Sequence, residues 1–293
     1  MAGLPARAYG SGVRAETLID VLAVARPEIR RRAPRLVRGT FHDVVVLDGE
    51  WAARFPRTEA ALADAPRRAR AAHLIAELDL PFAVPQVVER QLDRPLGEAH
   101  MIVSYVPGGP APENVSREAV LEAMRDILEP LGSVTLTPDL LAALDEPLSF
   151  AGGRHVVETI TERVFPLLSD DEQRQASGVL TRFRHLPPVP NHLLHGDLAP
   201  VNLHWQGDRV TGVLDWDFAH AGDPAFDAAA FGGFGWPLVR HAIGDTAYER
   251  ALTHAAMFPL TGAAGLLLQG ASPEKYLAWF RRRCAVRQHP PLL

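Results

Sequence analysis

The sequence contains very little cysteine and very little lysine. Cys284 is the only cysteine among 293 residues, so the chain can form neither an internal disulfide nor a zinc site made of several cysteines. Lys275 is the only lysine, and arginine supplies all the other basic side chains apart from histidine. A permanently charged cation in the N-terminal half of the chain is therefore an arginine.

A long apolar run and an excess of positive charge are also missing. Pro259 and several glycines interrupt the apolar stretch at residues 258–268, and no run reaches the roughly 18 residues of a membrane span. Residues 1–10 contain Arg7 but no apolar core of a secretory signal. The formal net charge of -5 offers no footprint for nucleic-acid phosphates and favours cationic over anionic small molecules. We expect a cytoplasmic enzyme that binds neither membranes nor nucleic acids.

Helix and strand patterns divide the chain into a small β-rich part and a larger helical part, which makes the fold class α+β. The boundary is Val106-Pro107-Gly108-Gly109-Pro110-Ala111-Pro112, whose prolines and glycines interrupt regular structure. We predict an N-terminal lobe at residues 1–106, a hinge at about residues 104–112 and a C-terminal lobe at residues 107–293. Strands are expected at residues 36–47, 51–55, 85–89 and 100–105, and helices at 16–24, 58–78, 116–131, 138–144, 156–168, 170–185 and from 225 onward. Pro66 leaves open whether the second helix begins before or after that residue.

One short β-hairpin interrupts the helical part and has polar residues at its margins. Its strands are expected at residues 201–205 and 209–214. Antiparallel pairing would bring Asn202 near Asp215, and Asp197 lies in the loop that leads into the hairpin. Carboxylate and amide oxygens suit Mg²⁺, and phosphoryl transfer needs a further carboxylate to orient the acceptor hydroxyl and take its proton. Asp197 is placed for that second task.

Four linked motifs in this region resemble those of the aminoglycoside phosphotransferase family, which is related to the protein kinases. They are His195-Gly196-Asp197 with Asn202, then Leu214-Asp215-Trp216, then Gly222-Asp223-Pro224, and finally Asp227. The resemblance implies a bilobal protein-kinase-like fold, ATP or GTP as phosphoryl donor, Asp197 as catalytic base, and Asn202 with Asp215 as ligands of Mg²⁺. From their positions, we expect His195 to be a packed, hydrogen-bonding loop histidine, and Asp223 and Asp227 to be turn or cap residues.

The same family places a phosphate-binding loop, a strand cation and a helix acid in the small lobe. The resemblance assigns the loop to Gly39 and Thr40 and the cation to Arg54, since arginine can bind phosphate through two N–H groups. Ala69 stands where the family has a glutamate, which leaves open whether an acid pairs with Arg54. The candidates are Asp64, Glu59 and Glu77, and the residues expected to line the adenine are Met101, Ser104 and Val106.

The family includes enzymes that act on antibiotics and others that act on metabolites such as homoserine or fructosamines. Residues 54–85 and 164–170 are similar to viomycin-type peptide-antibiotic phosphotransferases, and Phe82-Ala83-Val84-Pro85 is similar to macrolide phosphotransferases. We expect a cationic antibiotic as acceptor, first a tuberactinomycin peptide such as viomycin or capreomycin, then an aminoglycoside or a macrolide. Phosphorylation would give resistance. Asp217, beside the metal segment, is a candidate for binding a cationic acceptor.

Two other classes of protein stay open. A metal-dependent hydrolase would draw zinc ligands from His192, His195, Asp197 and His204, so these side chains would have to converge. A nucleotide-binding module without catalysis is the second alternative, because Ala69 removes the expected helix acid. The presence of Asp197, Asn202 and Asp215 together argues for an active kinase.

Overall fold

The computed structural model describes residues 15–47 and 49–286, and it divides into two compact units. The first unit consists of Met1–Gly109 together with Thr211–Asp217, and the second of Pro110–Val210 together with Phe218–Leu293. The sequence pattern indicated a single change of lobe near the Pro/Gly segment. Instead, the chain returns to the first unit at Thr211–Asp217, because this segment is bonded to N-terminal residues.

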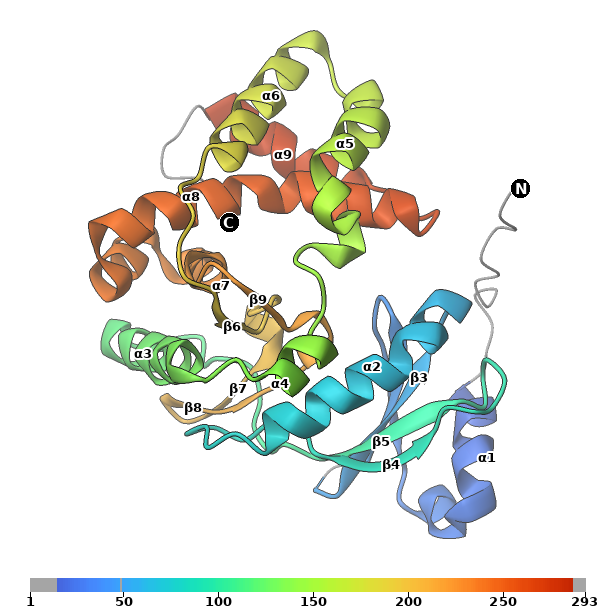
Figure 1. Ribbon diagram of the computed structural model, residues 1–293. Helices are drawn as coiled ribbons and strands as arrows, with labels where there is room; N and C mark the ends of the chain where they lie inside the picture. Colours follow the sequence, from blue (N-terminus) through green and yellow to red (C-terminus); the bar gives the residue numbers. More distant parts are fainter. Residues whose placement is uncertain (1–14, 48, 287–293) are drawn as a thin grey trace. The chain divides into compact units, whose positions relative to one another are not determined.

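A five-stranded antiparallel sheet forms the centre of the first unit (Figure 1). The strand order is β1-β2-β3-β5-β4. Residues 36–47 form two strands rather than one, because a tight turn separates them: the Gly39 N–H donates to the His42 carbonyl oxygen at 2.8 Å. The bounds are α1 Ala15–Ala25, β1 Arg35–Arg38, β2 His42–Leu47, β3 Trp51–Pro56, α2 Glu59–Ala76, β4 Val87–Gln91 and β5 His100–Ser104.

Different helices cover the two faces of this sheet (Figure 1). Apolar side chains of α1 pack against Ala53 and its neighbours on one face. On the opposite face, Ala69 of α2 packs against Met101 of β5, and Ala52 joins this cluster. Because alternate residues of a strand point to opposite faces, Arg54 lies on the same face as Ala52, which is the face covered by α2.

Helix α2 begins before its proline, which answers the question that the sequence left open. The helix starts at Glu59 and contains Pro66. The Thr58 hydroxyl caps the first turn by accepting the Ala61 N–H at 3.1 Å, a type of contact worth about 1 kcal/mol. Pro66 removes one hydrogen bond of the helix, and burial of the alanine face against the sheet holds the helix together across it.

The segment Thr211–Asp217 is held within the first unit by backbone bonds and by ring stacking. The Ala83 N–H donates to the Thr211 carbonyl oxygen at 2.9 Å, and the Ala83 carbonyl oxygen accepts the Val213 N–H at 2.9 Å. The rings of Phe82 and Trp216 stack with their centroids 6.4 Å apart. These contacts fix the backbone on both sides of Leu214.

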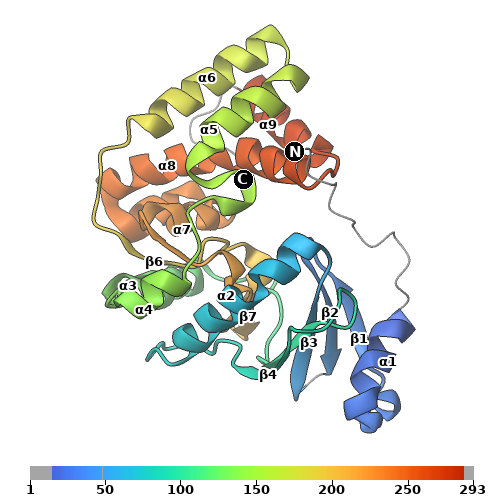
Figure 2. The same cartoon turned by 45° about the vertical axis from the view of Figure 1, so that its right-hand side comes forward.

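Helices make up most of the second unit, and α8 contacts α3, α6, α7 and α9 (Figures 1 and 2). Ser116, Thr137 and Ser169 cap the helices that follow them. The helix predicted at residues 156–168 is broken into a short α-helix, a π-helical turn and a 3₁₀ turn, because Pro166 cannot donate a backbone hydrogen bond. The bounds are α3 Arg117–Ser133, α4 Pro138–Ala143, α5 Val156–Thr159, α6 Asp170–Arg184, α7 Ala225–Ala230, α8 Trp236–Leu268 and α9 Glu274–Val286.

Helix α8 alone, within residues 15–47 and 49–286, has the length and hydropathy of a membrane span. Of its most apolar window, 72% is buried inside the protein. Gly244 interrupts the helix with a φ of 75°. Residues of α8 such as Leu260 and Ala263 belong to the apolar core of the second unit, together with Ile160 and Val164.

Two pairs of short strands carry the motif region. β7 (Leu203–Gln206) and β8 (Arg209–Val213) form the predicted hairpin, and the chain passes from the second unit to the first within β8. β6 (His192–Leu194) pairs with β9 (His220–Gly222), a pair that the sequence pattern did not indicate. Asn202 does not open the first hairpin strand as expected. It ends a 3₁₀ turn, in which its N–H donates to the Ala199 carbonyl oxygen at 2.8 Å.

Candidate active site

The loop after β6 is held in a fixed shape by a hydrogen bond between two of its own residues and by the conformation of Gly196. His195 is fully buried, and its Nδ1 accepts the N–H of Asp197 at 3.1 Å. Gly196 has a φ of 81°, and a Cβ atom there would lie 2.2 Å from the Phe218 carbonyl oxygen. Only glycine fits this position, so the sequence His195-Gly196-Asp197 presents the Asp197 side chain from a rigid turn.

Asp227 of α7 holds this loop by accepting hydrogen bonds from its backbone. Its Oδ2 accepts the His195 N–H at 2.6 Å, and its Oδ1 accepts the Gly196 N–H at 3.0 Å. Burial raises the pKa of Asp227 to about 7, although the two backbone donors oppose the shift. The residue was expected to cap a helix. It instead satisfies two buried backbone donors of a distant loop, a task that needs both carboxylate oxygens.

Asp197 and Asn202 are in direct contact within the second unit. Nδ2 of Asn202 donates to the Asp197 carbonyl oxygen at 2.8 Å and to Oδ2 of Asp197 at 3.2 Å. This orientation commits the amide nitrogen to Asp197 and turns Oδ1 of Asn202 away from it. An amide oxygen of this kind is a suitable ligand for Mg²⁺, so the donor chemistry of Asn202 fits the predicted role.

Asp215 belongs to the first unit and follows β8. It has a φ of 60°, which is uncommon for a residue other than glycine and marks a constrained position. Its Oδ1 accepts a hydrogen bond from Nη2 of Arg54 at 2.8 Å. Desolvation raises the pKa of Asp215, although the charge of Arg54 opposes the shift, and the side chain is 46% exposed. An exposed carboxylate also fits an Mg²⁺ ligand.

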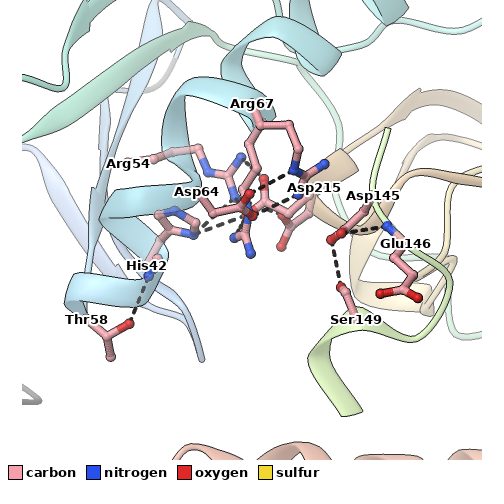
Figure 3. A network of polar contacts seen from close by, with 12 residues as sticks. His42, Arg54, Thr58, Asp64, Arg67, Asp145, Glu146, Ser149 and Asp215 are labelled. Carbon is pink, nitrogen blue, oxygen red and sulfur yellow. Dashed lines mark hydrogen bonds and ion pairs between the residues drawn. The ribbon is translucent and has the colours of Figure 1, made fainter. Parts of the chain in front are cut away.

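Arg54 is held by two acids that follow β8, Asp215 and Asp217, of which Figure 3 labels Asp215. Besides its bond to Asp215, Nη1 and Nη2 donate to the two carboxylate oxygens of Asp217 at 2.9 and 2.8 Å. Burial alone would lower the pKa of Arg54, but the charges of Asp217 and Asp215 raise it. The guanidinium is therefore permanently charged and fixed in orientation.

Asp217 is much less exposed than Asp215, the other acid that bonds to Arg54. Its side chain is 6% exposed, and its Oδ2 also accepts a bond from Nη1 of Arg68 at 3.0 Å. Burial opposes ionisation, yet Arg54 and Arg68 bring the pKa of Asp217 well below its usual range. We predicted that Asp217 binds a cationic acceptor. That contact stays a prediction, and the packing around this carboxylate does not favour it.

His42 completes this cluster as a neutral side chain. Its Nδ1 lies 3.3 Å from Oδ2 of Asp217. Burial and the neighbouring Arg54 charge lower the pKa of His42 to about 3. The contact with Asp217 is therefore not an ion pair at physiological pH, and Nδ1 of His42 also lies 3.4 Å from Nη2 of Arg54.

The other residues assigned to the nucleotide lie on the same sheet or its loops. Gly39 and Thr40 are exposed in the turn between β1 and β2, and Met101 is Arg54's cross-strand partner in β5. The Ser104 hydroxyl accepts the Gln86 N–H at 2.9 Å, and Val106 is buried. Their contacts with a nucleotide stay predictions.

None of the acids proposed on α2 serves Arg54. Ala69, at the position of the expected glutamate, is fully buried against Met101 and Val103. Asp64 bonds to Arg68 at 2.6 Å and to Arg67 at 2.8 Å, and Glu77 pairs with His73. No local pattern in the sequence indicates that Asp217 is the partner, because the two residues are 163 positions apart.

Asp223 anchors its loop to α8. Its Oδ2 accepts bonds from Nη2 of Arg250 at 2.6 Å and Nε2 of His254 at 2.8 Å, while Oδ1 accepts the Ala225 N–H at 3.0 Å. Burial opposes the shift, but hydrogen bonds from His254 and Arg250 lower the pKa of Asp223 below its usual range. Asp223 therefore bonds both to the turn that follows it and to Arg250 in a largely enclosed ion pair.

Two of the histidines considered for a zinc site, His192 and His195, make hydrogen bonds to different parts of the backbone. Nδ1 of His192 lies 2.8 Å from the Gly132 carbonyl oxygen, and Nδ1 of His195 accepts the Asp197 N–H. Over the parts of the chain that the structure describes, no three side chains of His, Cys, Asp or Glu are grouped to hold a metal ion. This arrangement does not support the hydrolase alternative.

Aromatic residues of α9 lie on the Asp197 side of the second unit, which the sequence did not indicate. Burial and the charge of Asp197 raise the pKa of Tyr276. The rings of Tyr276 and Trp279 are 6.2 Å apart, and Nζ of Lys275 lies 4.7 Å from the Tyr276 ring centroid. These rings offer an aromatic wall within electrostatic reach of the predicted base.

Solved structures of antibiotic phosphotransferases share this fold. The GDP complex of wild-type aminoglycoside 2'-phosphotransferase-IIIa matches 92% of this chain and 98% of its own, with a TM-score of 0.75 and 16% identity. A macrolide 2'-phosphotransferase from Brachybacterium faecium matches 92% and 99%, with a TM-score of 0.61 and 19% identity. The α+β, protein-kinase-like fold that the sequence predicted is confirmed.

Sequence comparison defines the class. The profile of the phosphotransferase enzyme family matches residues 36–264, so this chain belongs to the phosphotransferase enzyme family and is a small-molecule kinase. It is similar to viomycin phosphotransferase of Streptomyces vinaceus, with 32% identity over 227 residues that cover 74% of this chain and 78% of that protein. The resemblance inferred from the four motifs is therefore confirmed.

Proposed function

We propose that this protein transfers the γ-phosphoryl group of ATP or GTP to a hydroxyl of a cationic tuberactinomycin peptide such as viomycin or capreomycin. The contact between Asn202 and Asp197 is the observation that carries the proposal, because it leaves a carboxylate oriented as a base beside an amide oxygen suited to Mg²⁺. Phosphorylation in the cytoplasm would inactivate the antibiotic and give resistance. An aminoglycoside or macrolide is the next candidate acceptor.

The reaction needs one proton acceptor and one leaving group. The Asp197 carboxylate accepts the proton of the acceptor hydroxyl while that oxygen forms its bond to the γ-phosphorus. The bond between the γ-phosphorus and the β,γ-bridging oxygen breaks, and ADP or GDP leaves with the electron pair. Asn202 holds Asp197 in position through its Nδ2. Asp227 keeps the loop rigid by binding its backbone.

Most of the residues assigned to the nucleotide belong to the first unit. Asn202 and Asp215 would hold Mg²⁺, which neutralises charge on the β- and γ-phosphates when it is bound. Arg54 would bind the phosphates, and Gly39 and Thr40 would cover them. The purine would lie against Met101, Ser104 and Val106. The solved GDP complex of a structural relative supports a purine nucleotide as donor.

The identity of the acceptor rests on the sequence relationship and on charge. The relative with 32% identity is named for viomycin, and the formal net charge of -5 favours a cationic acceptor. The aromatic wall formed by Tyr276 and Trp279 suits the apolar and cationic parts of such a molecule.

A transfer assay with the purified full-length chain tests the proposal. Each of ATP and GTP, labelled in the γ-phosphate, is incubated with Mg²⁺ and with viomycin, capreomycin, kanamycin, erythromycin, homoserine or a fructosamine. We expect the highest kcat/KM with viomycin or capreomycin. A higher kcat/KM with homoserine or the fructosamine would make the protein a metabolite kinase. Absence of transfer to every compound would contradict the proposed function.

A further inference from the structure

We propose that Asp217 is the positioning residue that fixes Arg54 for phosphate binding, and that Arg68 of α2 holds Asp217 in turn. Helix α2 would then contribute a cation to the phosphate site, in place of the acid expected at Ala69. The inference rests on the proposed function, since it assigns a partner to the phosphate-binding cation of that same reaction.

Arg54 and Asp217 form a bidentate ion pair. Nη1 and Nη2 of Arg54 each donate to a different oxygen of Asp217, at 2.9 and 2.8 Å. Parallel bonds of this kind fix the plane of the guanidinium as well as its position. The side chains are 15% and 6% exposed, so the pair is screened from solvent far better than a surface ion pair.

Arg68 extends the pairing to helix α2. Its side chain is 9% exposed, its Nη1 donates to Oδ2 of Asp217 at 3.0 Å, and its Nε donates to Oδ2 of Asp64 at 2.6 Å. Its guanidinium carbon also lies 5.8 Å from the centroid of the Phe41 ring, in the loop that follows β1. Asp217 therefore lies between two buried arginines, one from the sheet and one from the helix.

Two N–H groups of Arg54 stay available for phosphate in this arrangement. A guanidinium has five N–H groups, and Arg54 uses one Nη1–H and both Nη2–H groups on Asp217 and Asp215. Its Nε–H and second Nη1–H have no carboxylate acceptor among the side chains that the structure describes. These two groups point to different sides of the guanidinium, because the Nε–H lies on the Nη2 side and the free Nη1–H lies beside Cδ, so each can donate to a separate phosphate oxygen.

Charge balance explains why the partner must be an acid. Without Asp217, Arg54 and Arg68 would be two buried cations with Asp64 and the half-exposed Asp215 left to compensate them. Like charges repel strongly in such an enclosed place, so the arginines would separate and Arg54 would leave its orientation. An amide at position 217 keeps the shape but removes the charge.

The first test is direct measurement of nucleotide affinity in the Asp217→Asn variant. We expect the Kd for ATP or GTP with Mg²⁺, measured by calorimetry, to rise by about tenfold or more, the size of a lost charge-assisted contact. The KM for nucleotide should rise in parallel, while the KM for the acceptor stays within twofold. Arg70→Gln, which removes an exposed charge from the same helix, is the matched control and should leave both values unchanged.

A double-mutant cycle then separates positioning from general destabilisation. If Asp217 acts through Arg54, Arg54→Gln combined with Asp217→Asn should weaken nucleotide binding no more than Arg54→Gln alone. Arg68→Lys should retain most of the affinity, whereas Arg68→Gln should lose it. Additive losses in the cycle, or an Asp217→Asn variant with normal nucleotide affinity, would overturn the inference.

Thermal unfolding of each variant shows whether it is folded. If Asp217→Asn fails to fold, Asp64→Asn replaces it, because Asp64 is 31% exposed and, although it also bonds to Arg67, it is connected to Asp217 through Arg68. A raised nucleotide Kd in folded Asp64→Asn supports the inference, and an unchanged value overturns it. Wild-type protein that binds nucleotide and transfers phosphate, with variants that behave normally, contradicts the inference alone. Wild-type protein without transfer contradicts the proposed function itself.

Discussion

The side-chain amide of Asn202 donates to both the backbone carbonyl and the carboxylate of Asp197, at 2.8 and 3.2 Å. One residue thus orients the predicted base through its nitrogen and offers its oxygen to a metal ion. Substitution of Asn202 should therefore impair both tasks.

The Asn202→Ala variant should therefore show two defects. We expect kcat to fall by about 10²-fold, because the Asp197 carboxylate loses its orienting donor. The Mg²⁺ concentration at half-maximal rate should also rise, because an oxygen ligand is removed. A Mg²⁺ titration of the rate measures both. A lower kcat with an unchanged Mg²⁺ requirement would refute the ligand role of Asn202.

Asp215→Ala should abolish the effect of Mg²⁺ on nucleotide affinity. The exposed carboxylate is the strongest oxygen donor assigned to the metal, and its loss removes a full negative charge. Calorimetric titration of nucleotide with and without Mg²⁺ gives the comparison. Wild-type protein should bind more tightly with Mg²⁺, and the variant should bind equally in both conditions. A preserved Mg²⁺ effect would place the metal ligand elsewhere.

Asp227 should make stability depend on pH. Burial raises its pKa to about 7 from the model-peptide value of 3.8, so the folded state binds the proton more tightly than the unfolded state. The stabilising contribution of protonated Asp227 is complete below about pH 4 and is lost as the pH rises through about 7. The free energy of unfolding of wild type, relative to Asp227→Asn, should fall between about pH 4 and pH 7.

Denaturant unfolding of both proteins across this pH range measures the difference. Asp227→Asn cannot accept two backbone hydrogen bonds and should be less stable than wild type at every pH. A difference that does not change with pH would show that Asp227 keeps one charge state throughout.

Asp223→Ala should destabilise the second unit strongly. Removal of this carboxylate leaves Arg250, whose side chain is 12% exposed, without its charged partner, and the expected cost is about 3–5 kcal/mol. The exposed pair Arg240–Asp245 has a similar distance of 2.7 Å, so Asp245→Ala serves as a control and should leave stability unchanged. Equal effects of the two variants in urea unfolding would argue against the anchoring role of Asp223.

The contiguous motifs made the reaction class predictable from the sequence. His195, Gly196, Asp197 and Asn202 lie within a few residues, and their spacing is set by one loop. The strand that carries Arg54 and the helix that follows it were also predicted from local patterns. Local sequence therefore predicted these elements and the class of reaction.

Pairings between distant residues could not be predicted in the same way. The partner of Arg54 is 163 residues away, and no helix or strand period connects Arg54 to Asp217. The strands β6 and β9 have three residues each, which is too short for an alternating pattern to emerge. Asp227 was predicted to be a cap because it lies near the start of a helix. Its carboxylate instead accepts hydrogen bonds from a loop 32 residues away, which no local pattern indicates.

The most direct test of the account is the rate of phosphoryl transfer to viomycin by Asp197→Asn, measured beside its nucleotide affinity. The substitution preserves the shape of the side chain and removes its capacity to accept the hydroxyl proton. We predict a fall in kcat of about 10²–10⁴-fold with a nucleotide Kd within about twofold of wild type. A variant that turns over at a near-normal rate would contradict the assignment of Asp197 as the base, and with it the proposed mechanism.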